Sequence, residues 1–245
     1  MKRLPHSPKR LSRDSLRILE HLCRYRLLPA DEVSRLHGLQ DLRRAETAIA
    51  RLVRSRLIGS DALYGDKTYY HLAPAAAHPS AGGDSVFPSH WLGPIPEKAK
   101  LIHYAVFAFC LMGASCRHLL TRPELEQHLP GLKDHRLPLN YYVELNDDQP
   151  RLGFIRVDTG GRGRWDRIVA RALDDWRDHE ARACFRPFVA QGQFEIAVLT
   201  ALPQKAERIR DAVARAGSPM SIRVCAIPQL LAILQPELAL PGATP

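Results

Sequence analysis

The chain has 245 residues, 45% of them hydrophobic, and a formal net charge of +9. It is long enough for a real core in one or two domains. The cysteines number five and are scattered without a C-x-x-C pair, which excludes a disulfide framework and a zinc site. The basic start lacks a following apolar segment, and the longest apolar run, 104–112, is too short to span a bilayer. We expect a soluble cytoplasmic protein.

The positive charge is concentrated at the amino-terminal end of the chain. Residues 1–80 contain 15 Lys and Arg against 8 Asp and Glu, a net charge of +7, which leaves +2 for the remaining residues. A basic segment on a nearly neutral body is typical of a nucleic-acid-binding head. This pattern does not separate DNA from RNA or from another anionic surface.

Residues 12–72 predict three helices followed by a two-stranded hairpin. The first helix has an apolar face at helical spacing, formed by Leu16, Leu19, Leu22 and Cys23. A break leads into a short second helix over 31–37, which Gly38 ends.

The third helix, capped by Asp41, has two contrasting faces. Its inward face is predicted to consist of Leu42, Ala45, Ile49, Leu52 and Val53. Its opposite face has a polar row formed by Arg43, Thr47, Arg51 and Arg54. Such a helix suits the major groove of DNA, because Arg binds guanine edges in a bidentate manner and also neutralises phosphates.

The hairpin follows over 57–72, with Gly65-Asp66 at its tip and Lys67 beside it. The order of these elements predicts a winged helix-turn-helix, although a small helical bundle with a solvated basic face remains the alternative. We expect Arg43, Arg44, Thr47 and Arg51 to contact bases and nearby phosphates. We expect contacts to the DNA backbone from Arg54, Lys67 and Tyr69.

Composition divides the chain further, because 73–97 is rich in Pro, Gly, Ala and Ser. The predicted organisation is a flexible arm (1–11), a winged helix-turn-helix domain (12–75), a linker (76–97), an α/β domain for dimerisation or sensing (98–235) and a flexible tail (236–245). A strongly apolar helix at 97–113 opens the α/β domain and belongs either to its core or to a subunit interface. Strands then alternate with helices, which predicts a mixed or largely parallel sheet. The predicted strands are 139–145, 152–158, 193–200 and 221–227.

The segments RILEHLCRYRLLPADEVSRLHG and YYHLAPAAA, with the Arg-rich third helix between them, resemble the winged-helix module of the replication-relaxation family. The segments HWLGP and LIHYAVFAFCLM resemble that family's helix after the linker. The strand LGFIRVDTG resembles its second domain, which is similar to the αβββαβ core of restriction endonucleases, PD-(D/E)XK. The resemblance implies a DNA-binding protein of plasmids or integrative elements, either a regulator or an accessory of replication or transfer.

The sequence departs from the nuclease pattern of that core, which needs two acidic residues and a Lys two residues after the second. Asn140 stands where the first carboxylate is wanted, and Gly160 lies two residues after Asp158. No Lys occurs between Lys133 and Lys205, and an Arg stays protonated. We therefore expect a degenerate, non-catalytic domain without metal or cofactor, and keep a metal-dependent nuclease with an atypical site as an alternative.

The loop after this strand contains Gly160, Gly161, Arg162 and Arg164. Glycines between a strand and a helix allow backbone N–H groups to approach an anion, so the loop is either an anion or effector site or a flexible turn.

The sequence as a whole predicts a sequence-specific, homodimeric regulator of transcription, a repressor encoded on a mobile element, that binds double-stranded DNA. An unidentified effector or protein partner would act through the α/β domain. The alternatives are an accessory protein of plasmid replication or conjugative transfer, the nuclease, and an adaptor that uses the winged helix to bind a protein.

Overall fold

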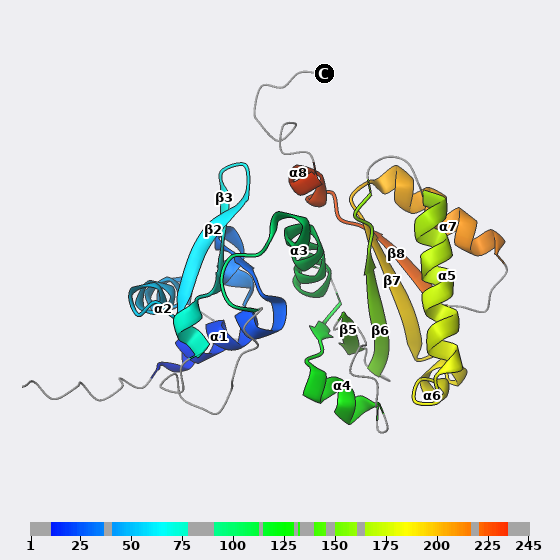
Figure 1. Cartoon of the computed structure of the whole chain (residues 1–245), viewed down its shortest axis with the longest axis horizontal. Coiled ribbons are helices and arrows are strands. Elements are labelled where there is room, and N and C mark those ends of the chain that lie inside the picture. The colour runs from blue at the N-terminus through cyan, green and yellow to red at the C-terminus, as the bar shows by residue number, and fades with distance from the viewer. Residues whose placement is uncertain are drawn as a thin grey trace, which may run out of the picture. The chain divides into compact units, whose positions relative to one another are not determined.

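The computed structural model describes residues 11–36, 41–77, 91–112, 115–129, 132, 140–145, 150–160, 165–216 and 221–234. The chain divides into two compact units, 1–97 and 98–245, each of mixed α and β structure. Figure 1 shows the elements of both. The predicted tail, Gly38 and all but the last residue of the predicted arm lie outside the described residues.

The first unit combines helices with a small antiparallel sheet. Strands β1, β3 and β2 lie side by side in that order, and β2 and β3 form the expected hairpin. Gly65 at its tip has a φ of +56°, a conformation that glycine adopts without steric cost. In chain order the elements are α1 (Arg13–Tyr25), β1 (Leu28–Pro29), the 3₁₀ helix η1 (Ala30–Arg35), α2 (Leu42–Arg54), β2 (Ile58–Tyr64), β3 (Lys67–Leu72) and η2 (Pro74–Ala77).

Helix α1 begins where Ser12 caps it and buries a face slightly rotated from the predicted one. The Ser12 hydroxyl accepts the backbone N–H of Ser15 at 3.2 Å. The buried positions are Ser15, Ile18, Leu19, Leu22 and Tyr25. The prediction for Leu16 was wrong: its side chain is 49% exposed, because Ser15, Ile18 and Leu22 occupy the centre of the buried arc.

The second predicted helix is not an α-helix. Its segment forms η1, which begins at Ala30, directly after the β1 residue Pro29. A run of six residues that includes a β-branched Val33 is short for an α-helix, and such short pieces commonly adopt 3₁₀ geometry. Val33 and Leu36 are nevertheless buried, so the segment still contributes to the core of the unit.

Residues 91–95, placed by the sequence in a linker, pack on the first unit. Gly93 donates its N–H to the carbonyl of Leu72 at 2.7 Å, and the guanidinium of Arg26 lies over the ring of Trp91. Ile95 is only 3% exposed. Residues 91–95 of the predicted linker are therefore part of a packed structure.

The second unit is built on a mixed sheet with strand order β4-β5-β6-β7-β8. Strands β4, β5 and β6 are antiparallel, whereas β6, β7 and β8 are parallel, which confirms the mixed sheet predicted from sequence. The sequence missed the short elements β4 and α6. In chain order the elements are α3 (Glu97–Leu111), β4 (Arg117–Leu119), α4 (Arg122–His128), β5 (Tyr141–Leu145), β6 (Pro150–Val157), α5 (Trp165–Ala181), α6 (Arg186–Ala190), β7 (Phe194–Thr200), α7 (Pro203–Arg215), β8 (Ile222–Ala226) and α8 (Leu230–Leu234).

Helices cover both faces of this sheet. Helices α5 and α7 lie on one face, and α3 lies on the other (Figure 1). Trp176 of α5 packs against Phe194 on the first face. On the second face the rings of Phe109 of α3 and Tyr142 meet edge-on, with their centroids 5.1 Å apart. No described helix combines the length and apolar character that crossing a membrane requires.

The face toward α3 contains a buried network of charges. Glu144 accepts hydrogen bonds from Arg117 at 3.2 Å and from Arg223 at 2.6 Å. Glu195 is bound by Arg223 and Tyr142. Burial raises the pKa of Glu144, but hydrogen bonds from Arg223 and Ser115 and the charges of Arg117 and Arg223 together hold that pKa below its ordinary value. The charges therefore compensate one another within the sheet.

Candidate nucleic-acid interface

Helix α2 has a buried side and an exposed side, and most of its residues lie on the side that the sequence predicts. Asp41 caps it by accepting the N–H of Arg43 at 2.9 Å. The buried side is formed by Ala45, Ala48, Ile49 and Leu52. The opposite side is exposed and contains the predicted polar row, Arg43, Thr47, Arg51 and Arg54. The four side chains thus lie on one solvent-facing surface of a rigid helix, which we call the outer face of α2.

Leu42 and Val53 do not join the core, contrary to the sequence prediction. They are 51% and 43% exposed, because both lie at the edge of the buried arc rather than near its centre. Together with Val33 of η1 and Tyr70 of β3 they line a hollow of about 420 Å³ beside the outer face. This flank of α2 is therefore mainly apolar, with the charged side chains of Glu46 and Arg54 also lining the hollow.

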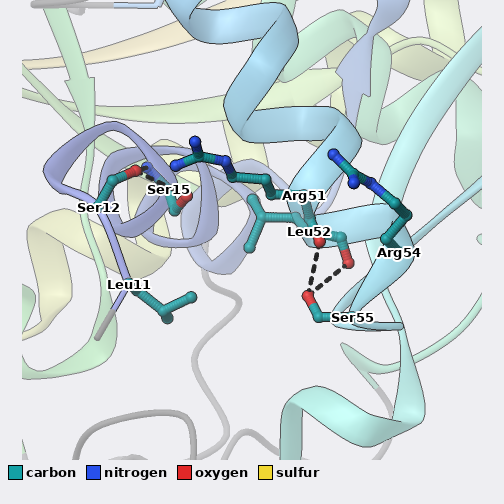
Figure 2. Close-up of a pocket in the computed structure, with 7 residues that line it drawn as sticks. All are labelled: Leu11, Ser12, Ser15, Arg51, Leu52, Arg54 and Ser55. Atoms are coloured by element: carbon teal, nitrogen blue, oxygen red, sulfur yellow. Dashed lines mark hydrogen bonds between the residues drawn. The ribbon is translucent and has the colours of Figure 1, made fainter. Parts of the chain in front are cut away.

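The other flank is polar and meets the start of α1. A hollow of about 660 Å³ is lined there by Leu11, Ser12, Ser15, Arg51, Leu52, Arg54 and Ser55. Figure 2 shows the Arg51 side chain extending toward Ser12 and Ser15, while Arg54 leaves the helix in another direction. The hydroxyl of Ser55 donates to the carbonyl of Arg51 at 2.8 Å, which closes the carboxyl end of α2.

This hollow has the electrostatic character of an anion site. The first N–H groups of an α-helix are not used within it and give its start a partial positive charge. The guanidinium of Arg51 lies beside the start of α1, where the Ser15 N–H is bonded to the Ser12 hydroxyl and Asp14 adds a carboxylate to the first turn. This carboxylate lies 3.9 Å from Arg44, whose side chain is 76% exposed. The sequence did not predict that the start of α1 lies beside Arg51, although a Ser directly before an amphipathic helix indicated where that helix begins.

Lys67, predicted to contact a phosphate, already has an anionic neighbour. Its ammonium group donates to Asp31 of η1, and this hydrogen bond raises the Lys67 pKa above its ordinary value. Both side chains are nearly half exposed. The cation lies at the hairpin, as expected, but it is shared with a carboxylate.

The structure corrects the prediction for Tyr69. The residue is fully buried, and its hydroxyl accepts the N–H of Ile95 at 2.7 Å. Burial raises the Tyr69 pKa to about 12. Strand alternation turns this side chain into the unit, so Tyr69 cannot contact the DNA backbone without unfolding.

The predicted anion loop is described only at its start, because Gly161, Arg162 and Arg164 lie outside the described residues. The N–H of Gly160 is used internally, by the carboxylate of Asp158 at 3.1 Å, which contradicts its prediction as an anion contact. Asp158 is buried and also binds Thr200 at 3.0 Å and Lys205 at 2.7 Å. The sequence missed this lysine, which α7 brings beside the strand end.

Comparisons with protein-family models, with curated proteins and with solved structures found no match for this chain.

Proposed function

We propose that the chain binds double-stranded DNA in a sequence-specific manner and regulates transcription. The observation that carries this proposal is the outer face of α2. Its three arginines and Thr47 are exposed together, while the opposite side of the same helix is fixed in the core. A helix held in this way can enter the major groove without rearrangement and place guanidinium groups against guanine edges.

The first unit then acts as a winged helix-turn-helix. In this interpretation η1 takes the place of the second helix, α2 is the recognition helix, and the β2–β3 hairpin is the wing. The antiparallel pairing of β1 with β3 fixes the hairpin to the segment that leads into η1. The short 3₁₀ geometry of η1 is compatible with this role, because its buried residues still support α2.

Phosphate contacts come from both sides of the recognition helix. The hollow between α2 and the start of α1 accepts one backbone phosphate, held by Arg51 and the helix start. Lys67 contacts another at the hairpin after leaving Asp31. Such contacts position the helix and make affinity fall with salt, whereas base contacts determine the sequence.

The second unit pairs subunits or binds an effector, and the protein acts as a repressor of its own gene on a mobile element. This part of the proposal follows the family resemblance. A homodimer predicts two inverted half-sites with centres about 10 base pairs, or a multiple of that, apart. Selection of bound DNA from a randomised duplex library tests it, because a single half-site would contradict dimeric binding.

Regulation is tested by fluorescence anisotropy against duplexes that tile the DNA upstream of the protein's own gene. The proposal predicts that one tile binds far more tightly than random DNA of equal length. Tight binding confined to a replication origin would instead favour the accessory role. Equal, weak binding to every duplex would contradict sequence-specific regulation in either form.

A further inference from the structure

The centre of the outer face of α2 presents methyl groups rather than polar atoms. Thr47 is exposed there, and its hydroxyl donates to the carbonyl of Arg43 at 2.8 Å, one turn back along the helix. A Thr hydroxyl engaged with the i−4 carbonyl has its donor occupied. The hydroxyl therefore has no donor left for a base, and the exposed Thr47 offers its methyl group for an apolar contact.

Ala50 extends this methyl surface by one step. It is exposed and lies three residues after Thr47, so the two side chains are neighbours on the helix. Its carbonyl accepts the Nε–H of Arg54 at 3.2 Å, which holds the Arg54 side chain along the helix. The methyl groups of Thr47 and Ala50 thus lie among the arginines of the outer face, after Arg43 and before Arg51 and Arg54 along the helix.

In the major groove, the C5 methyl of thymine is the apolar group that distinguishes one base from the others, and Ala and Thr methyl groups contact it. We infer that Thr47 and Ala50 form a contact surface for thymine C5 methyl groups at the centre of the bound site. This inference rests on the proposed function. It assigns thymine methyl groups to Thr47 and Ala50 and leaves guanine contacts to Arg43.

The inference is tested with the duplex that the full chain selects from a randomised library. Each thymine of that duplex is replaced in turn by deoxyuridine, which removes only the C5 methyl group. Burial of one methyl group corresponds to about a four-fold change in affinity. We expect one or two central positions to weaken binding by about that factor, and positions outside the contacted bases to have no effect.

Two variants of the same residue separate the methyl group from the hydroxyl. Thr47→Ser keeps the hydroxyl and removes the methyl, so it should bind the thymine and deoxyuridine duplexes equally at the position that Thr47 contacts. Thr47→Val keeps a methyl and removes the hydroxyl, so it should retain the four-fold preference. Circular dichroism of both variants establishes that α2 is intact.

The outcomes distinguish this inference from the proposed function. If the chain binds no duplex tightly, both fall together. If it binds a selected duplex tightly and every deoxyuridine replacement is neutral, DNA recognition stands and the methyl contact is wrong. A preference that persists in Thr47→Ser and is lost in Thr47→Val would also overturn it, because the hydroxyl would then be the contacting group.

Discussion

The hydroxyl of Tyr69 accepts the backbone N–H of Ile95 at 2.7 Å inside the first unit. This bond attaches the segment after residue 90 to the hairpin strand β3, and it gives Tyr69 a structural role in place of the expected DNA contact. Tyr69, which lies in strand β3 of the hairpin, thus stabilises the first unit.

Tyr69→Phe is expected to lower the free energy of unfolding by about 1–3 kcal/mol, because the buried N–H of Ile95 loses its acceptor. DNA affinity at low temperature should stay the same. Urea unfolding and anisotropy on the same preparations check both parts. A large loss of affinity without a loss of stability would show that Tyr69 contacts DNA after all.

Removal of either Arg43 or Arg51 tests the outer face of α2 directly. Arg43→Ala should weaken binding to a selected duplex by about 1–3 kcal/mol if the side chain contacts a guanine. Arg51→Ala, which removes the proposed phosphate contact, should weaken binding to selected and scrambled duplexes by similar factors. Arg208→Ala on α7, also an exposed helix position, is the matched control for loss of charge. Unchanged binding in both α2 variants would remove this helix from the interface.

Asp31 competes with DNA for Lys67. Asp31→Asn should therefore tighten DNA binding, by up to about five-fold, since exposed ion pairs contribute about 0.2–1 kcal/mol. Asp174→Asn removes a comparable exposed carboxylate, paired with Arg177 on α5, and should have no effect. Weaker binding by Asp31→Asn would contradict the proposed contact.

His179 makes the second unit sensitive to acid. It is buried among aromatic rings and bonded to the Tyr141 hydroxyl at 2.7 Å, and burial lowers its pKa below 6.5. Below pH 6.5 His179 binds a proton in the unfolded chain but stays neutral in the folded chain. The free energy of unfolding therefore decreases as the pH is lowered below this value.

Urea unfolding at about pH 7.5 and about pH 5 measures this effect. His179→Gln should be less stable than the parent at the higher pH and should show a smaller difference between the two conditions. An identical pH dependence in both proteins would show that another group is responsible.

The buried pair Asp158–Lys205 predicts a non-additive result. Lys205→Met leaves the Asp158 carboxylate buried without its cation and should cost about 3–5 kcal/mol of stability. Adding Asp158→Asn removes the uncompensated charge and should restore part of that loss. Additive effects in a urea double-mutant cycle would contradict a coupled pair.

Periodicity predicted the parts of the fold that depend on one regular element. Helix α2 and its polar row follow from apolar residues at steps of three and four, and the hairpin follows from its turn residues. The exposure of Leu42 and Val53 could not be predicted, because a helical pattern gives an apolar arc but not the width that neighbouring elements cover.

Contacts between distant segments had no local signal. Lys205 lies beside Asp158 because the parallel strands β6 and β7 bring the start of α7 to the end of β6. The start of α1 had a local signal in Ser12, but its place beside Arg51 depends on the packing of α1 against α2. Sequence reasoning identified the charged residues of α2, while tertiary packing determined which other groups join them.

The central claim is that the outer face of α2 contacts particular bases. The most direct test is the ratio of dissociation constants for a selected duplex and a scrambled duplex, measured by anisotropy with the full chain at low and at physiological salt. We expect a ratio of about 1,000 or more, retained at both salt concentrations. A ratio near one, with both affinities collapsing as salt rises, would leave only a basic surface and would contradict sequence-specific binding.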